Sequence, residues 1–265
     1  MTRKLPIVAV DIGNSRIKFG LFDRPAPRQP PWPRSHLVLA SDAWSGSAIT
    51  NWLTNNDVAE IDWCISSVRS ELDENLLRWI DERDREDLVQ ILSAVVVPIT
   101  IDLPQPDRIG VDRLTAAVAA NSCRDPQRPA IVVDAGSAIT VDLISEDGVF
   151  RGGAILPGAR LAARVLHSMT DQLPLAKLGS FAQPPDALGR STEAAIQSGL
   201  YWGAIGAVDA LVTQLIKSVV DDDAEDEIEV FVTGGAGEWL AGALNRPAEW
   251  MPHLTLSGIA LSAAE

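Results

Sequence analysis

The stretch Leu5–Phe22 reads LPIVAVDIGNSRIKFGLF, and its pattern decides the fold class. β-Branched and aromatic residues dominate both arms, and Asp11–Asn14 places turn-forming residues between them. This pattern is typical of two strands joined by a tight turn. The stretch therefore predicts a β-hairpin whose turn carries Asp, Gly and Asn.

A second stretch, Arg128–Ile144, reads RPAIVVDAGSAITVDLI and has the same form. At an offset of 123 residues the two stretches share four identities, which on their own are weak evidence. The identical pairs are Pro6/Pro129, Val10/Val133, Asp11/Asp134 and Gly13/Gly136. The shared strand–Asp-x-Gly–strand form favours an internal duplication. We therefore expect two similar lobes, residues 1–125 and 126–265.

The segments around these hairpins alternate between strand-like and helical patterns, which is typical of an α/β chain. The expected elements are short buried strands at Trp63–Val68 and Ala94–Val97, a helix with Leu72 and Leu76 on its apolar face, a strand at Glu229–Thr233 and a helix from about Glu238. The acidic segment Asp221–Glu229 is expected to include a solvated loop.

A long helix is expected after Thr192. Its apolar side would run along Ile196, Leu200, Gly203, Ala207, Leu211 and Leu215. Gly199, Gly203 and Gly206 leave the same stretch without side-chain bulk, so that another backbone could approach closely. The helix is thus either a core helix or part of a dimer contact.

Composition excludes several classes of protein. The net charge of −14 argues against a nucleic-acid partner, because non-specific binding of a phosphate backbone needs a basic face. The two cysteines lie in no metal-binding or redox motif and are expected to be reduced. The apolar run Leu5–Val10 is too short for a signal sequence, and no run approaches the roughly 18 apolar residues of a membrane span. We expect a cytoplasmic protein without membrane contact.

The hairpin turns are the first candidate sites. A glycine in a turn lets backbone N–H groups point at an anion, and Asn14 and Ser15 add side-chain donors. Asp11 would act through a metal ion or an ordered water, because two anions repel. An ordinary hairpin turn explains one copy about as well. The second copy at Asp134–Ala138 favours function, since two such turns facing each other across a cleft would clamp a polyphosphate.

Gly110-Val111-Asp112-Arg113 precedes an alanine-rich helix and forms the second candidate site. Asp112 at a helix start is commonly a cap. Alternatively, its carboxylate could accept the proton of an attacking hydroxyl, while the planar fork of Arg113 holds a carboxylate. A weaker candidate is Thr233–Gly235, which would allow close approach to a flat ring such as adenine. The phosphate-binding motifs GxxxxGK[ST] and GxGxxG are absent from the sequence.

Six motifs, in order and at similar spacing, resemble those of the type III pantothenate kinases. They are DIGNSRIKFG at Asp11, GVDR at Gly110, DAGSAITVD at Asp134, GGAILPG at Gly152, GRSTEAAIQSG at Gly189 and VTGGAG at Val232. This family is a branch of the actin-like sugar-kinase and chaperone ATPase superfamily, and the resemblance covers almost the whole chain. It implies two actin-like (ribonuclease H-like) lobes with a nucleotide cleft between them. It also implies transfer of the γ-phosphate of ATP to the primary hydroxyl of pantothenate, the first step of coenzyme A biosynthesis.

The resemblance further implies roles for individual residues. The implied contacts to ATP are Asp11, Ile12, Gly13, Asn14, Ser15, Arg16, Ile17, Lys18 and Ser137, the last standing where the family usually has Thr. The implied contacts to pantothenate are Gly110, Val111, Asp112 and Arg113, with Asp112 as the general base. Thr192 is implied to reach the substrate across a homodimer, and Asp134 to ligate K⁺ or NH₄⁺. Mg²⁺ would accompany ATP.

The chain departs from the family before GVDR. The family commonly shows Tyr-x-Asn-Pro there, and this chain has Leu103-Pro104-Gln105-Pro106, which removes an aromatic wall and a polar contact for pantothenate. Two alternatives stay open: a related kinase with another acceptor alcohol, and a non-enzymatic accessory factor in transcription. The acidic composition argues against direct DNA contact.

Overall fold

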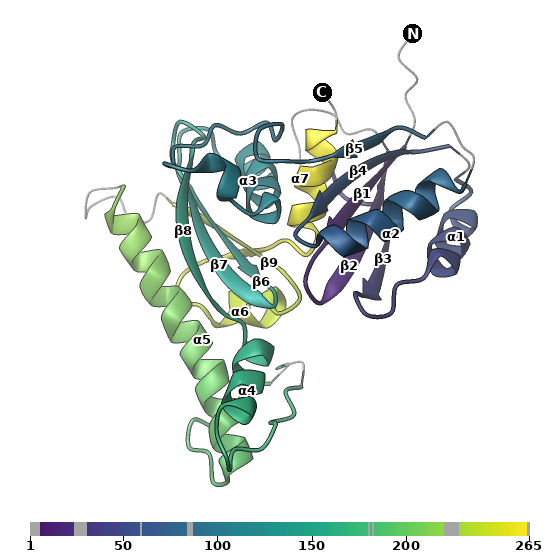
Figure 1. Cartoon of the computed structure of the whole chain (residues 1–265). Helices are drawn as coiled ribbons and strands as arrows, with labels where there is room; N and C mark the ends of the chain where they lie inside the picture. Colours follow the sequence, from purple (N-terminus) through teal and green to yellow (C-terminus); the bar gives the residue numbers. More distant parts are fainter. Residues whose placement is uncertain are drawn as a thin grey trace. The chain divides into compact units, whose positions relative to one another are not determined.

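The computed structural model describes residues 6–23, 31–58, 60–83, 87–179, 181, 183–219 and 228–263. The chain forms two compact units (Figure 1). The first unit holds the residues up to Arg124, Gly148–Phe150 and the segment from His253 onward, and the second holds Asp125–Asp147 and Arg151–Pro252. The chain leaves the first unit one residue before the expected lobe boundary. Its last segment, expected in the second lobe, belongs to the first unit.

A five-stranded sheet in the order β3-β2-β1-β4-β5 forms the centre of the first unit. Its strands are β1 (Ile7–Ile12), β2 (Arg16–Phe22), β3 (Ser35–Ala40), β4 (Asp62–Ser67) and β5 (Val89–Ile91). Strands β1, β2 and β3 pair antiparallel, whereas β4 runs parallel to β1 and β5 runs parallel to β4. The predicted hairpin is therefore confirmed as the start of a larger sheet.

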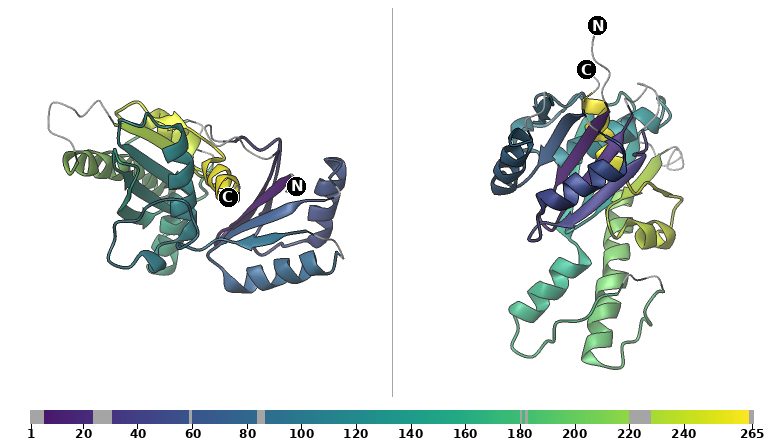
Figure 2. Two further views of the ribbon diagram at one scale, coloured as in Figure 1. Left: turned by 90° about the horizontal axis from the view of Figure 1, so that it is seen from above. Right: turned by 90° about the vertical axis from the view of Figure 1, so that its right-hand side faces the viewer.

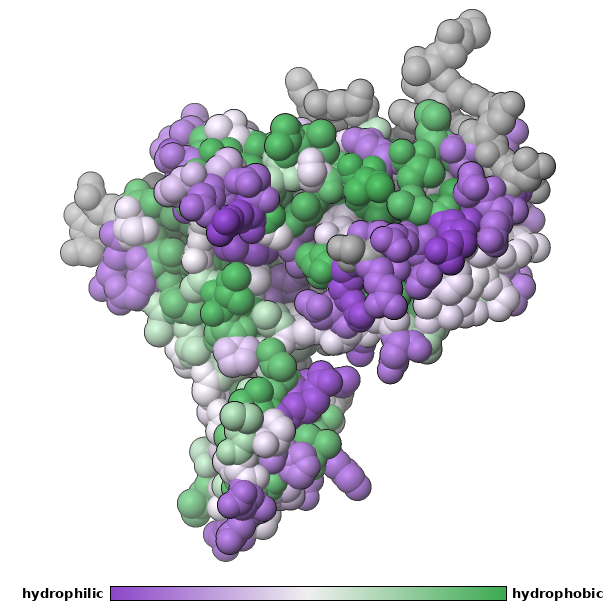
Figure 3. All heavy atoms as spheres, in the orientation of Figure 1, coloured by the Kyte–Doolittle hydropathy of each residue, from purple (hydrophilic) through white to green (hydrophobic). Residues whose placement is uncertain are grey.

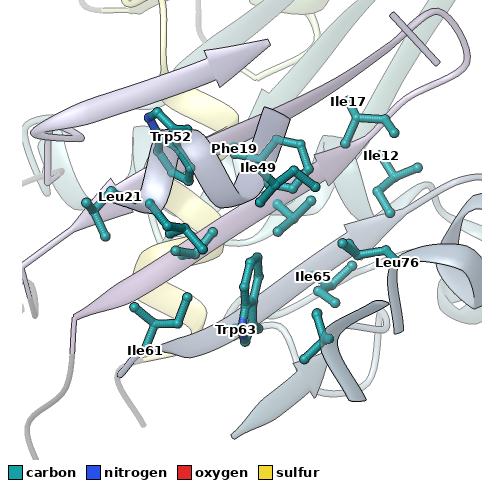
Figure 4. Close-up of a cluster of buried hydrophobic side chains, with 14 of the residues drawn as sticks. Ile12, Ile17, Phe19, Leu21, Ile49, Trp52, Ile61, Trp63, Ile65 and Leu76 are labelled. Carbon is teal, nitrogen blue, oxygen red and sulfur yellow. The ribbon is translucent and has the colours of Figure 1, made fainter. Parts of the chain in front are cut away.

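One face of this sheet carries the main core of the first unit, covered by α1 (Gly46–Asn55) and α2 (Ser70–Asp81) (Figure 4). Val10, Phe19 and Trp63 point to this face and are buried. Because side chains alternate along a strand, Asp11 points to the opposite face. The core thereby leaves the carboxylate of Asp11 available on the other side of the sheet.

The opposite face of the sheet is covered by α7 (Leu254–Ser262), which packs against β1, β2 and β4. Helix α3 (Val111–Cys123) packs against α7 and follows the short 3₁₀ helix η1 (Pro106–Arg108). At Gly20, a Cβ would lie 3.3 Å from a methyl group of Leu256, which shows how closely α7 approaches this face. Helix α3 is thus held on the sheet face to which Asp11 points.

The second unit repeats the strand order of the first. Its sheet runs β10-β9-β6-β7-β8, so that β8-β7-β6-β9-β10 corresponds to β3-β2-β1-β4-β5. The strands are β6 (Ala130–Ala135), β7 (Ala138–Ile144), β8 (Phe150–Pro157), β9 (Glu229–Thr233) and β10 (Glu249–Trp250). The β6–β7 pair is antiparallel and the β6–β9 pair is parallel, as in their counterparts. The predicted duplication is confirmed.

Three helices belong to this unit: α4 (Ala159–Ser168), α5 (Thr192–Lys217) and α6 (Gly237–Ala243) (Figure 2). The long helix after Thr192 is confirmed, but its predicted buried side is wrong by about one residue. The side chains buried in the helix are Ile196, Ser198, Tyr201, Ile205, Val208, Val212 and Ile216, whereas Gly203 is exposed. Because α5 is apolar on most sides, the spacing of apolar residues alone does not select the side that faces the sheet.

Helix α5 is long and largely apolar, although it contains no uninterrupted run of about 18 apolar residues. It has 26 residues and contains an 18-residue window of mean hydropathy 1.3, of which 28% is buried. By length and composition it is a candidate span within the described residues. One such helix is weak evidence of a membrane, because the core helix of a globular unit has a similar composition.

The predicted strand at Ala94–Val97 is wrong. The strand beside β4 is β5, and residues 94–97 form turns in which Val96 and Val97 donate to the carbonyl oxygen of Ser93. Val95 is 85% exposed, so an apolar run does not make a buried strand once the chain has left the sheet. Most of the acidic segment predicted as a loop lies outside the described residues.

Neither Cys64 nor Cys123 forms a disulfide in the structure, and both were expected to be reduced thiols. Cys64 is buried on β4, and burial raises the pKa of its thiol to about 12. A thiol with such a high pKa remains protonated and unreactive at neutral pH. Neither its burial nor its pKa gives Cys64 a role in catalysis.

Candidate active site

The first candidate site is the turn between β1 and β2. Strand pairing continues through Asp11, opposite Lys18, and Ile12, opposite Ile17. The turn therefore comprises Gly13–Ser15, later than the predicted Asp11–Asn14. The N–H of Gly13 donates to the carbonyl oxygen of Arg16 at 3.0 Å, which closes the turn.

The carbonyl oxygens of four successive residues, Ile12–Ser15, all accept hydrogen bonds from other segments. The donors are Val68 N to Ile12 O (3.1 Å), Ser41 Oγ to Gly13 O (3.1 Å), Arg69 Nη1 to Asn14 O (3.4 Å) and Ser41 N to Ser15 O (3.1 Å). Carbonyl oxygens would repel a bound anion. Here they are directed at protein donors, and the turn is compatible with a phosphate ligand.

The charges beside this turn are partly compensated. Lys18 Nζ lies 3.0 Å from Asp11 Oδ2, and Asp11 is only 7% exposed. This ion pair offsets the negative charge that Asp11 would otherwise present to a phosphate. Arg16, at the start of β2, is exposed. The side chain of Asp11 can take part in binding Mg²⁺ while Lys18 limits its repulsion of phosphate.

The second candidate site is the turn between β6 and β7, formed by Gly136 and Ser137. The N–H of Gly136 donates to Ala138 O at 3.0 Å, so this turn is one residue shorter than its counterpart. The carbonyls again accept bonds from other segments, Ala135 O from Ala236 N and Ser137 O from Gly158 N, each at 3.0 Å. The duplication therefore extends from strand order to the bonds that fix each turn.

Two glycines of the sequence motifs lie against this second turn. Gly234 has a φ of +89°, and a Cβ there would lie 2.4 Å from Asp134 Oδ1. At Gly158, a Cβ would lie 2.5 Å from the carbonyl oxygen of Gly136. The positive φ and the approach to Asp134 both favour glycine at position 234. The contact of Thr233–Gly235 with a flat ring stays a prediction.

Asp112 lies at the start of α3 but is not its cap. The N-cap is Gly110, the helix begins at Val111, and Asp112 is its second residue. The half-buried Asp112 accepts a hydrogen bond from the N–H of Arg113 at 2.9 Å. A Cβ at Gly110 would lie 2.5 Å from Asp112 Oδ1, so the glycine makes room for this carboxylate.

Arg113 is positioned by an aromatic ring. Its guanidinium carbon lies 5.6 Å from the centre of the ring of Phe150, which is fully buried. Such a cation–π contact helps to fix the plane of a guanidinium. The geometry is compatible with the predicted role of Arg113 in binding an acid group.

Thr192 is the first residue of α5 and is exposed. The motif around it builds the helix start: Ser191 is the N-cap, and its side chain accepts from Ala194 N at 3.2 Å. At Gly189, a Cβ would lie 2.3 Å from Ala195 N. The motif thus fixes the position of Thr192 at an exposed helix end.

The structure brings the predicted residues together in separate groups. Residues 11–18 form one turn in the first unit, where α3 also carries residues 111–113, preceded by the N-cap Gly110, and Asp134 and Ser137 form the turn of the second unit. Sequence reasoning missed Ser41 and Arg69, which bind the first turn from other segments. Within the described ranges, no three His, Cys, Asp or Glu side chains group as metal ligands.

Two sheets of the same strand order, each with an Asp-x-Gly turn, define a duplicated α/β fold of the actin-like type. A family model described as type III pantothenate kinase matches residues 7–214, and the chain belongs to this family. A type III pantothenate kinase of Halorhodospira halophila is 32% identical over 254 residues, which are 94% of each chain. That of Agathobacter rectalis is 29% identical over 262 residues, 96% of this chain and 95% of the relative.

A solved structure shows the same fold at low sequence identity. It is described as a reductive activator for a corrinoid, iron–sulfur protein, and the TM-score is 0.53 at 10% identity. The match covers 100% of this chain and 61% of that chain. At this identity the likeness supports the fold alone.

Proposed function

We propose that this protein phosphorylates pantothenate with ATP, forming 4'-phosphopantothenate in the first step of coenzyme A biosynthesis. Membership of the type III pantothenate kinase family supports the reaction. The observation that carries the proposal is the turn at Ile12–Ser15, in which every carbonyl oxygen accepts a hydrogen bond from another segment of the protein. Such a turn favours a phosphate-bearing ligand.

The nucleotide would bind through the turn of the first unit. Residues 11–18 would hold the phosphates of ATP, and the hydroxyl of Ser137 would supply a further contact to the nucleotide. Serine retains the hydroxyl that threonine has in the family. Asp11, through its carboxylate and bound waters, would hold the Mg²⁺ that neutralises phosphate charge.

The acceptor alcohol would bind at the start of α3. Gly110 and Val111 line this stretch, Arg113 binds the carboxylate of pantothenate, and Asp112 accepts the proton of its primary hydroxyl. Proton transfer comes late, because a loose transition state keeps the hydroxyl proton until bond formation is advanced. Leu103 and Gln105 replace an aromatic and an amide of the family pattern, which is expected to weaken pantothenate binding.

An assay of ADP release with and without pantothenate tests this function. Pantothenate-dependent ADP release, with phosphorylated pantothenate identified by mass spectrometry, is the expected result. Release of ADP with another alcohol but not with pantothenate would favour a related kinase. Absence of turnover with every acceptor would favour a non-enzymatic role. The proposed setting is the cytoplasm, without a nucleic-acid or membrane partner.

A monovalent cation, K⁺ or NH₄⁺, is proposed to bind beside Asp134. The residues present fit such an ion, because the carboxylate of Asp134 lies close to Gly136 and Gly234, and hard cations take carboxylate and carbonyl oxygens. The ion would add positive charge beside the turn that carries Asp134.

Activity should therefore depend on the monovalent cation. We expect substantially faster turnover in KCl or NH₄Cl than in NaCl at equal ionic strength. The measurement is the initial rate of ADP release at saturating ATP and pantothenate. Equal rates in sodium and potassium buffers would contradict the proposed ion at Asp134.

A homodimer is proposed for the second unit, with Thr192 reaching the substrate of the partner. Exposed apolar side chains gather on and around α4 (Figure 3). They are Ile155, Leu161, Val165, Met169, Leu175, Leu188 and Trp202. On α5, a Cβ at Gly199, Gly203 or Gly206 would meet nothing within 4 Å. A symmetric contact with a second copy would bury this apolar surface.

Val165→Asp should convert the dimer into a monomer and weaken pantothenate binding. Val165 lies on α4 and is 49% exposed, so the change removes apolar surface without disturbing the core. Sedimentation velocity and the KM for pantothenate are the measurements. Ile91→Asp on β5, 52% exposed, is the matched control and should remain dimeric. A wild-type monomer with full kinase activity would refute the proposal.

A further inference from the structure

Arg69 occupies a position that helix formation does not favour. It is the N-cap of the 12-residue helix α2, which has no side-chain cap hydrogen bond. Ser, Thr, Asp and Asn are preferred at this position because their side chains accept from helix N–H groups. A cation there is also unfavourable, because the N-terminus of a helix carries partial positive charge. Local stability therefore does not explain an arginine at this place.

The backbone around Arg69 is fixed against the first turn. Val68 N donates to Ile12 O at 3.1 Å, which joins the end of β4 to the end of β1. Arg69 N donates to Ser67 Oγ at 2.9 Å, and the Ser67 hydroxyl contacts Arg69 O at 3.4 Å. The backbone from which the Arg69 side chain extends is therefore fixed beside the turn.

The guanidinium reaches the turn but uses little of its bonding capacity there. Nη1 donates to Asn14 O at 3.4 Å, which is long for a hydrogen bond between nitrogen and oxygen. A guanidinium has five N–H donors. Across the described ranges, this is the one hydrogen bond made by the guanidinium of Arg69. Most of its donors are therefore available to a ligand at the turn.

The second turn is one residue shorter than the first. In it, the carbonyl oxygen of Ser137 accepts from the backbone N–H of Gly158 at 3.0 Å, just as the carbonyl oxygen of Ser15 accepts from Ser41 N at 3.1 Å. Ser137 is therefore the counterpart of Ser15. The hydrogen bond from Arg69 is made to Asn14, the residue by which the first turn is longer.

We propose that Arg69 binds phosphate oxygens of ATP, a role that rests on the proposed kinase function. Lys18 is paired with Asp11 at 3.0 Å, and Arg69 would add to the positive charge that Lys18 and the exposed Arg16 bring to this turn. The planar fork of Arg69 suits phosphate oxygens, and the N-terminus of α2 adds positive potential beside it. Arg69 is a binding residue for the nucleotide and takes no proton.

Arg69→Gln is the informative substitution, because glutamine retains an N–H donor for Asn14 and removes the charge. We expect the Kd for Mg·ATP to rise about 10–100-fold, the range for loss of a charge-assisted hydrogen bond. The Kd for adenosine should not change, because adenosine has no phosphate. Calorimetry without pantothenate measures both constants. In kinetics, the KM for ATP should rise and the KM for pantothenate should stay the same.

Three comparisons make the test decisive. Arg78→Gln, an equal loss of charge on the exposed side of α2, should bind ATP as the wild type does. Arg69→Lys should recover part of the affinity that Arg69→Gln loses. Wild-type ATP affinity in folded Arg69→Gln would overturn the role of Arg69 and leave the kinase function intact. Failure of the wild type to bind ATP would instead overturn the proposed function.

Discussion

Asp112→Asn is expected to lower kcat by roughly 10²–10⁴-fold, the range for one positioned acid–base group. Asparagine has nearly the same shape, and its Oδ1 can still accept the 2.9 Å hydrogen bond from Arg113 N. It cannot accept the proton of the pantothenate hydroxyl. The substitution therefore separates the chemical role of Asp112 from its structural one. Steady-state kinetics at saturating ATP and pantothenate measure the effect.

The alternative for Asp112, a helix cap, predicts little change. The structure argues against a capping role for Asp112, because the N-cap of α3 is Gly110. The thermal midpoint of unfolding and the affinity for ATP should remain near the wild-type values. Asp107→Asn, the same loss of charge at an exposed residue of η1, is the matched control. A folded Asp112→Asn protein with near wild-type turnover would reject the base assignment.

Gly258→Ala is expected to destabilise the first unit by about 1–3 kcal/mol, as overpacking of a core does. Alanine normally stabilises a helix relative to glycine. At Gly258 on α7, however, a Cβ would lie 1.7 Å from the carbonyl oxygen of Thr115 and 2.5 Å from its carbonyl carbon. These are backbone atoms of α3 and cannot rotate away. The two helices would have to separate.

Urea unfolding of Gly258→Ala measures this effect as a lower midpoint. Gly242→Ala on α6 is the control, because it is exposed and a Cβ there would meet nothing within 4 Å. The control should be neutral or slightly stabilising. Turnover should also fall in Gly258→Ala, since α3 carries Asp112. A variant as stable as the wild type would show that α3 and α7 are not packed so closely.

Much of the fold follows from local pattern. The β-branched and aromatic residues of Leu5–Phe22 and Arg128–Ile144, with turn residues between the arms, predicted both hairpins. The repeated Asp-x-Gly predicted the duplication that the two sheets confirm. Local pattern succeeded here because residues close in sequence are also paired in the strands. It failed at Ala94–Val97 and on the buried side of α5, where contact with a distant sheet decides burial.

The motifs named the candidate site residues, but they did not predict the contacts around those residues. Asp11, Asp112 and Asp134 follow from short patterns, and the family match agrees with the chemistry that those patterns indicate. The reason for a glycine was harder to predict from its motif. The sequence offered Thr233–Gly235 as a weak candidate for a ring contact, which stays a prediction; the structure adds that Gly234 has a positive φ and approaches Asp134 where β9 packs beside β6.

The sequence by itself determined the duplicated α/β architecture, the kinase family and the turns that carry its motifs. Only the tertiary structure decided how the first turn is held. Ser41 follows β3 and Arg69 follows β4, yet both donate to carbonyl oxygens of Gly13–Ser15. These contacts arise because β1 pairs with β2 and β4, and β2 pairs with β3, so that strand ends far apart in the chain meet at one edge of the sheet. No local pattern specifies such a meeting, since it depends on the order of strands across the sheet.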